Sequence, residues 1–183
     1  MMQFKELNMS GVYEISPRIV KDDRGAFVKT FHEGIFHQHG LLETEFKEEY
    51  YSISKEATLR GLHFQLPPDE HVKLVYCIEG KVQDVLLDLR KGSPSYLKAI
   101  TLELSGSCSN VLYIPKGIAH GFLTISDQAV MVYKTSTVYV PESDYGVSWK
   151  SCEGIWQITK PLILSERDQL HPLVANFKSP FVF

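Results

Sequence analysis

Short apolar runs, each about as long as one β-strand and each closed by a turn signal, fill most of the chain between residues 58 and 140. The clearest pair is residues 74–78 and 82–89, which are separated by a short turn containing Gly80. Two such runs around a tight glycine turn predict a β-hairpin. Turn signals that recur about every 8 to 12 residues favour a β-sandwich or barrel. The predicted fold class is therefore all-β, a jelly-roll or cupin-like sandwich with a few short helices.

Other strands are predicted where β-branched and aromatic residues gather, over residues 3–20 (one or two strands), 26–31, 43–54, 100–104, 111–114 and 128–140. Residues 32–40 are predicted as a short helix whose histidines, His32, His37 and His39, lie in solvent. Ser165 is the predicted N-cap of a second helix. The apolar tail, residues 177–183, is predicted to pack on the body or on a second subunit.

Length and composition narrow the class of protein. A chain of 183 residues fits one domain, residues 1–183, with a substantial core. Three cysteines without a CxxC spacing predict a reducing compartment and no disulfide framework. The net charge of −3 argues against a nucleic-acid binder. Neither a signal peptide nor a run of about 18 to 20 apolar residues is visible. We therefore expect a cytoplasmic protein that binds neither nucleic acid nor membrane.

One short motif points to a small barrel. Pro115, Gly117 and His120 have the spacing P-x-G-x-x-H, which resembles the second signature of the cupin superfamily. The first cupin signature normally supplies two histidines and a glutamate to a metal, whereas this chain offers only His63 there. His71 would supply a further imidazole, but the proline-rich segment before it predicts a surface loop. A metal-dependent cupin isomerase or dioxygenase is therefore one alternative.

A longer, ordered set of motifs is similar to the dTDP-4-dehydrorhamnose 3,5-epimerase family of nucleotide-sugar epimerases. The resemblance extends from about Arg24 to Asp168. It is carried by Arg60-Gly61-Leu62-His63-Phe64-Gln65, Lys73-Leu74-Val75, Asp84-Val85, Asp88-Leu89-Arg90, Ser93-Pro94, Ile114-Pro115, Ala119-His120-Gly121-Phe122, Tyr133-Lys134 and Leu164-Ser165 with Asp168. It implies a homodimer without metal or organic cofactor. The implied substrate is a 4-keto-6-deoxy sugar carried on a nucleoside diphosphate, as in deoxysugar biosynthesis.

Epimerisation beside a ketone removes a proton from one face of a carbon and returns it on the other. This chemistry needs a base, an acid on the opposite side and a donor for the enolate oxygen. The resemblance assigns the base to His63 and the carboxylate that orients it to Asp168. It assigns the acid to Tyr133, and it places Lys73 near the keto oxygen. Histidine and tyrosine suit these tasks because of their ordinary pKa values.

The resemblance also implies a set of substrate-binding residues. Arg24 and Arg60 match residues that hold the diphosphate, whose oxygens suit the paired donors of guanidinium. The full set is Arg24, Phe27, Lys29, Glu48, Arg60, His120 and Tyr139. Each candidate also has an ordinary structural interpretation. A core histidine, a core tyrosine, a helix-end charge and a solvated lysine or arginine would look the same in the sequence.

Two segments depart from the family pattern. Lys29 stands where members carry an acidic residue, and residues 48–51, Glu-Glu-Tyr-Tyr, stand where members carry Gln-Asp-Asn-His. The family uses these positions to contact the base and the sugar, while the catalytic set is intact here. We therefore expect the same reaction on a changed substrate, at C3, C5 or both. The remaining alternative is a non-catalytic jelly roll that binds nucleotide sugars.

Overall fold

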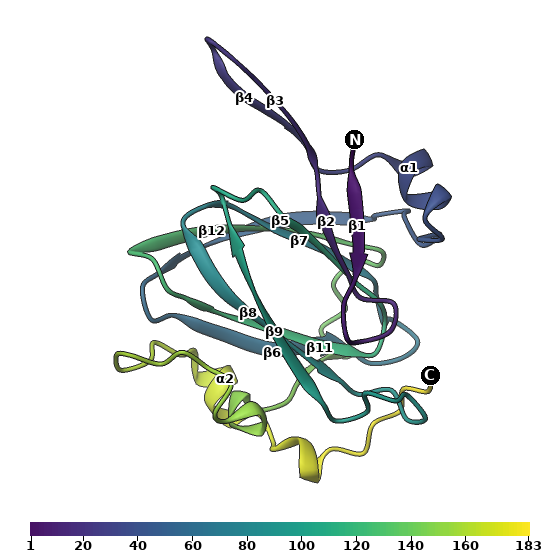
Figure 1. Cartoon of the computed structure of the whole chain (residues 1–183). Helices are drawn as coiled ribbons and strands as arrows, with labels where there is room; N and C mark the ends of the chain where they lie inside the picture. Colours follow the sequence, from purple (N-terminus) through teal and green to yellow (C-terminus); the bar gives the residue numbers. More distant parts are fainter.

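The computed structural model describes residues 1–183 and contains two antiparallel sheets that face each other (Figure 1). The six-stranded sheet runs in the order β1 (Gln3–Glu6), β2 (Tyr13–Ser16), β10 (Val111–Ile114), β7 (Lys73–Glu79), β12 (Gln128–Thr135) and β5 (Glu48–Lys55). The five-stranded sheet runs in the order β13 (Asp144–Gly146), β6 (Leu59–Gln65), β11 (Ile118–Thr124), β8 (Lys81–Asp88) and β9 (Ala99–Ser105). The predicted all-β sandwich is confirmed.

A separate two-stranded sheet stands apart from this body. It consists of β3 (Arg18–Asp22) and β4 (Gly25–Lys29), which pair with each other and form a hairpin that projects away from the sandwich (Figure 1). The side chains of Val20 and Phe27 on this hairpin are 44% and 63% exposed. A lone two-stranded hairpin is only marginally stable in water, so this arm has little to hold it within its own chain.

The helices are few and short, as predicted. They are α1 (Glu33–Gln38), α2 (Glu166–Leu170) and the 3₁₀ turns η1 (Trp149–Cys152) and η2 (Val174–Asn176). The Ser165 hydroxyl accepts a hydrogen bond from the backbone N–H of Asp168 at 3.1 Å, which confirms the predicted N-cap. The histidines of the first helical segment are exposed. The tail packs on the body, because Phe181 is buried and contacts Phe64.

None of the helices has both the length and the apolar character needed to cross a membrane.

The interior between the sheets changes character along its length. At one end it holds an apolar cluster that includes Val75 and Cys77 of β7 and Met131 of β12. Every second residue of a strand faces the same side. Lys73 of β7 and Tyr133 of β12 therefore face the interior as Val75, Cys77 and Met131 do, but they lie nearer the other end of the sandwich. That end of the sandwich is polar, and the apolar cluster behind it supplies a rigid base.

The predicted hairpin of residues 74–89 is wrong. Its two halves are β7 and β8, which lie in opposite sheets and do not pair. Both edges of β7 are occupied, by β10 and β12, so no edge is free for β8. The chain instead passes from one sheet to the other at Gly80. The sequence shows the turn but not the partners of each strand, because those partners come from distant segments.

Several other boundaries differ from prediction, such as the strand predicted over residues 43–54, which is β5 (Glu48–Lys55). Residues 3–20 contain β1, β2 and most of β3 rather than one or two strands. The run 128–140 ends as a strand at Thr135, and His120 lies within a further strand, β11, that is not among the predicted ones. In each case the pairing with a neighbouring strand, rather than local composition, sets where the extended chain stops.

Gly80→Ala is expected to destabilise the protein strongly. Gly80 has φ +75°, and an added Cβ would lie 1.9 Å from the carbonyl oxygen of Gln128. Gly92 is the matched control, because it has φ +88° and open space around it. Gly92→Ala should lower the free energy of unfolding by only the roughly 1–2 kcal/mol of the left-handed conformation. Urea denaturation of both variants measures the difference, and equal losses would contradict this account of the crossing.

Candidate active site

A cavity of about 390 Å³ opens between the sheets at their polar end. Seven of the eleven predicted site residues line it: Glu48, Arg60, His63, Lys73, His120, Tyr133 and Tyr139. Such a volume is within the usual range for small-molecule sites. The residues come from both sheets, so the walls that face each other across the cavity are chemically different.

The close approach of β6 and β11 aligns two of the histidines. His63 and His120 are direct partners in the pairing of these strands. Gly61 has φ +115°, and a Cβ there would lie 2.6 Å from Cα of Gly121 and 2.7 Å from the carbonyl oxygen of His120. Only glycine allows this contact. The two glycines of the Arg-Gly-Leu-His and Ala-His-Gly motifs therefore place both imidazoles on one wall.

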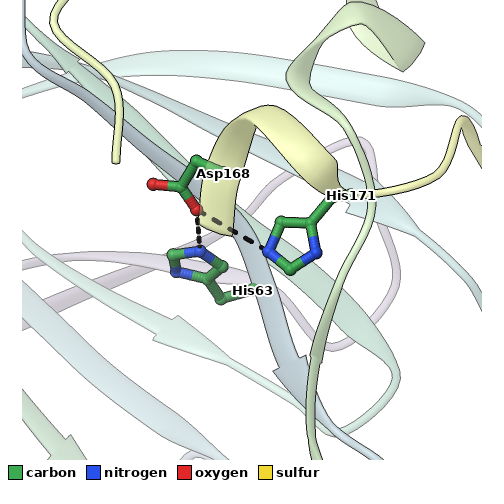
Figure 2. Close-up of side chains that lie close together, drawn as sticks. All are labelled: His63, Asp168 and His171. Atoms are coloured by element: carbon green, nitrogen blue, oxygen red, sulfur yellow. Dashed lines mark hydrogen bonds and ion pairs between the residues drawn. The ribbon is translucent and has the colours of Figure 1, made fainter. Parts of the chain in front are cut away.

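His63 is joined to Asp168 from a distant part of the chain (Figure 2). Its Nε2–H donates to Oδ1 of Asp168 at 2.5 Å. Nδ1 makes no hydrogen bond and is the nitrogen left for a ligand in the cavity. Burial lowers the pKa of His63, although the hydrogen bond and charge of Asp168 oppose this. Burial would raise the pKa of Asp168, but the hydrogen bonds from His63 and Ser165 outweigh it and lower that pKa.

Lys73 lies beside His63 at the base of the cavity. Its Nζ donates to the backbone carbonyl oxygen of His63 at 3.1 Å, and the residue is only 7% exposed. Burial lowers the pKa of Lys73 to about 8, while the charges of Asp144 and Asp84 partly oppose the effect. An ammonium group held here without a directly paired carboxylate is an electrostatic site for a developing negative charge.

Tyr133 stands on the opposite sheet from His63. Its phenol oxygen lies 3.3 Å from Oγ of Ser52, and its ring stacks on that of Tyr50 with centroids 4.9 Å apart. Burial raises the pKa of Tyr133 well above its ordinary value. The phenol is therefore protonated at neutral pH, and its ring is held by two residues of the neighbouring strand β5.

His120 is backed by a second carboxylate. Its Nε2–H donates to Oδ2 of Asp84 at 2.7 Å, and both residues are almost fully buried. Burial raises the pKa of Asp84, although His120 opposes this. The cavity thus has two His–Asp pairs on adjacent strands, of which His63 is the more open to solvent.

Hydrogen bonds and ion pairs hold the polar residues at the mouth of the cavity. Glu48 accepts a hydrogen bond from the backbone N–H of Tyr139 at 2.7 Å, and the Tyr139 hydroxyl donates to Asp144 at 3.1 Å. Both guanidinium Nη atoms of Arg167 lie 2.6 Å from the Asp144 carboxylate. Arg60 donates to Ser54 Oγ at 3.0 Å. The mouth is therefore an ordered polar rim that carries cations and anions together.

Four predicted residues do not line this cavity: Asp168, which contacts it only through His63, and three residues of the β3–β4 hairpin. Arg24, Phe27 and Lys29 lie on the projecting β3–β4 hairpin, and the side chain of Arg24 is 90% exposed. Within this chain Arg24 pairs with Asp22. The prediction that these residues join the same site is not met within one chain, because the hairpin points away from the sandwich (Figure 1).

Sequence reasoning missed several residues of the site: Tyr50, Ser52, His71, Asp84, Asp144, Arg167 and His171. His71 was predicted at the surface of a loop; it is in a loop, but it is half-buried and lines the cavity. Gln65 and Thr137 lie within 3.3 Å of its Nδ1 and draw it inward. The spacing Asp168-x-x-His171 was a usable signal, since residues three apart share a helix face.

The histidine set considered for a metal is not assembled. His63, His71 and His120 do not bring their ring nitrogens together, and Nε2 of His120 is bonded to Asp84. One group of three possible metal ligands does lie close together, namely His63, Asp168 and His171.

The known proteins that are similar to this chain over most of its length are epimerases of 4-keto-6-deoxy sugars. The family model for dTDP-4-dehydrorhamnose 3,5-epimerase matches residues 6–176. An Escherichia coli K12 protein of that name is 42% identical over 158 residues, or 85% of each chain. The solved structure of a Legionella pneumophila 3,5-epimerase in complex with dTDP-4-keto-L-rhamnose has a TM-score of 0.91 at 31% identity, and the match covers 97% of this chain and 95% of that one. NovW, a 4-keto-6-deoxy sugar epimerase from Streptomyces spheroides, has a TM-score of 0.89 at 33% identity and covers 96% and 88%.

The imidazole of His63 is expected to titrate below its ordinary pKa of about 6.5, because burial outweighs the effect of Asp168. Asp168→Asn removes a partner that favours the protonated ring, so it should lower that pKa further. A proton–nitrogen NMR titration of the histidine rings measures both values. A His63 pKa above 6.5, or a rise in Asp168→Asn, would contradict this account of the pair.

Proposed function

The chain belongs to the dTDP-4-dehydrorhamnose 3,5-epimerase family, and from that membership we propose how its cavity works. The protein is an isomerase that epimerises a nucleoside-diphosphate-linked 4-keto-6-deoxy sugar through an enolate. The observation that carries the proposal is that His63 and Tyr133 line one cavity from opposite sheets. A sugar ring placed between them has a base on one face and an acid on the other.

His63 removes the proton next to the ketone. Its Nδ1 accepts the proton while Nε2–H continues to donate to Asp168. The carboxylate stabilises the imidazolium as it forms and holds the ring in the tautomer that leaves Nδ1 free. A lowered pKa keeps His63 neutral, and therefore able to act as a base, at neutral pH.

Lys73 and His120 stabilise the enolate. As the proton leaves, negative charge moves to the keto oxygen, where a fixed cation or donor lowers the barrier most. The Lys73 ammonium is charged below about pH 8. His120 is fixed by Asp84 and presents its Nδ1 edge to the cavity. Both groups are buried, so the surroundings screen their effect less than water would.

Tyr133 returns a proton on the opposite face. Its raised pKa means that the phenol stays protonated until the carbanion takes the proton. Stacking on Tyr50 and contact with Ser52 restrict the direction in which the phenol points. Because orientation decides whether one or two carbons are reached, this tyrosine pair is where C3, C5 or double inversion is determined.

The diphosphate is held at the mouth. Arg60 lies at the cavity edge without a carboxylate partner, so its guanidinium is available for phosphate oxygens. Arg167 is tied to Asp144 and gives the rim its shape. Tyr139 is 55% exposed at the same rim and offers a ring face for the base.

We further propose that the active form is a homodimer in which the hairpin of one chain completes the cavity of the other. The exposed apolar side chains of the hairpin need cover, and the edge strand β5 exposes Tyr51 and Ile53 by 67% and 56%. The same strand carries Glu48 and Tyr50 at the cavity mouth. A hairpin docked there would bring the partner's Arg24, Phe27 and Lys29 to the substrate.

The base recognised is proposed to differ from thymine. Glu48 is an acid where the family pattern has an amide, Lys29 is a cation where the pattern has an acid, and Glu48 accepts a hydrogen bond from the backbone of Tyr139. A carboxylate accepts hydrogen bonds but does not donate them, whereas an amide does both. A rim with Glu48 therefore favours a nucleotide base that presents donors to it, which an amide at this position would not require.

His63→Ala should abolish solvent deuterium incorporation at C3 and C5, with a loss of at least about 10²–10⁴-fold, typical of a general base. Tyr133→Phe should keep deuterium incorporation and impair inversion, because the base remains while the opposite acid is gone. Proton NMR in heavy water with nucleotide 4-keto sugars measures both. Deuterium exchange at the wild-type rate in His63→Ala would show that His63 is not the base. Equal losses of deuterium incorporation and inversion in Tyr133→Phe would indicate that Tyr133 has a structural role.

Mixing two inactive variants tests the shared site. Arg24→Ala and His63→Ala are each expected to be inactive, but a mixed dimer carries one cavity with both native residues. Activity should therefore return on mixing after reversible dissociation, and light scattering should report a dimer. Mixing His63→Ala with Lys73→Ala is the control, because both residues belong to the body of the same chain and each cavity of the mixed dimer keeps one defect. No recovery in the first mixture, with dimers present, would rule out the swapped hairpin.

Binding of dTDP, GDP, CDP and UDP tests the changed base. We expect a preferred nucleotide other than dTDP, measured by calorimetry. Glu48→Gln should shift the preference toward dTDP, because it restores an amide at the rim. A preference of the wild-type protein for dTDP alone would refute the proposal.

A further inference from the structure

His171 places a second imidazole beside the His63–Asp168 pair (Figure 2). It caps the end of α2, three residues after Asp168, so both side chains are presented on one side of the helix turn. Its Nε2 lies 3.7 Å from the same Oδ1 that accepts from His63. That nitrogen is buried and has no hydrogen-bond partner. A buried nitrogen aimed at a carboxylate without a bond is an unused ligand atom.

The chain makes room for this ring. Gly146 pairs with His63 across β13 and β6, and an added Cβ there would lie 2.5 Å from Nε2 of His171. Gly146 does not have a positive φ, so its backbone does not require glycine. Its role is spatial: the absent side chain is the place where the imidazole of His171 lies.

We propose that His63, Asp168 and His171 form a binding site for zinc or a similar divalent transition-metal ion, and that filling it switches the enzyme off. The three ligand atoms lie within 4.8 Å of one another. Two imidazole nitrogens and one carboxylate oxygen are a donor set that zinc accepts, with a fourth position open to water. The site takes a soft or borderline cation rather than Mg²⁺ or Ca²⁺, which need more oxygen ligands.

The distances fit with small movements. Zinc bonds of about 2.0–2.2 Å place neighbouring ligand atoms of a tetrahedral site roughly 3.3 Å apart. The contacts of Oδ1 with His63 and His171, at 2.5 and 3.7 Å, lie on either side of that spacing. Asp168 lies on α2 and His171 follows directly as its C-cap, so a slight shift of α2 away from β6 opens the first contact, and a rotation of the His171 side chain closes the second.

Inactivation follows from the position of one proton, and this step rests on the proposed role of His63 as the base. In the metal-free pair, Nε2 of His63 carries the hydrogen and Nδ1 has the free electron pair. Zinc needs the electron pair of Nε2. The hydrogen must then move to Nδ1 through solvent, with no net gain or loss of protons by the neutral ring. The nitrogen that faces the substrate can no longer accept a proton.

The first experiment measures binding without reference to activity. Full-length protein, stripped of metal with a chelator, is titrated with Zn²⁺ in a calorimeter, and Mg²⁺ serves as a second probe. We expect one Zn²⁺ per chain and no Mg²⁺ binding. His171→Phe keeps a flat ring over Gly146 but has no nitrogen, and it should weaken Zn²⁺ binding at least about tenfold. His32→Ala is the matched control, since His32 is exposed and makes no cap hydrogen bond.

The second experiment measures deuterium exchange against free Zn²⁺, with each variant compared with its own metal-free rate. The zinc concentration for half-inhibition should rise at least about tenfold in His171→Phe, parallel to binding, and stay unchanged in His32→Ala. Absence of Zn²⁺ binding to the wild-type protein, or equal binding by wild type and His171→Phe, would overturn the site. Zn²⁺ binding without inhibition would confirm the metal site but contradict the proposal that zinc inactivates the enzyme. If the protein showed no exchange at all, the calorimetry would still decide whether the site exists.

Discussion

The hydrogen bond between His63 and Asp168 is the interaction on which the site depends. It joins residues 105 positions apart and ties the short helix α2 to the wall of the five-stranded sheet. The N-cap of that helix, Ser165, holds the backbone of Asp168, so the carboxylate is fixed before it meets the imidazole. The base that we propose, His63, needs its proton on Nε2, and a positioned acceptor such as Asp168 favours that tautomer.

Two packed sheets explain why one cavity presents two kinds of chemistry. His63 and His120 come from adjacent strands of one sheet, whereas Lys73 and Tyr133 come from adjacent strands of the other. The apolar end of the sandwich holds these strands rigid, because its side chains are almost wholly buried. Charged groups at the polar end are tolerated because partners meet them: Asp84 backs His120 and Asp168 backs His63.

Two exposed elements, the β3–β4 hairpin and the edge strand β5, leave apolar side chains uncovered. The β3–β4 hairpin carries apolar side chains and three predicted ligand-binding residues, yet contacts little of its own body. The edge strand β5 places apolar side chains outside and cavity residues at its mouth. The second chain that we propose would cover both surfaces and would link assembly to the completion of the site. His171 lies beside the same His63–Asp168 pair and completes the set of three ligands that we propose for zinc.

Several parts of the protein were determined by the sequence itself. Alternating apolar and polar residues with frequent turns specified strands, and hence an all-β sandwich, because a strand exposes alternate residues to opposite sides. The spacing around His120 indicated a cupin-like barrel, and the ordered set of motifs from Arg24 to Asp168 resembles the epimerase family, which implied the chemistry. The pairing of strands was decided only in the tertiary structure: residues 74–89 look like a hairpin, but both edges of β7 are taken by distant strands. Tertiary contacts also decided which charges meet, such as Asp84 with His120 and His171 with Asp168. Local sequence records the character of a side chain, but the partner of a buried charge comes from wherever the fold brings another segment alongside it.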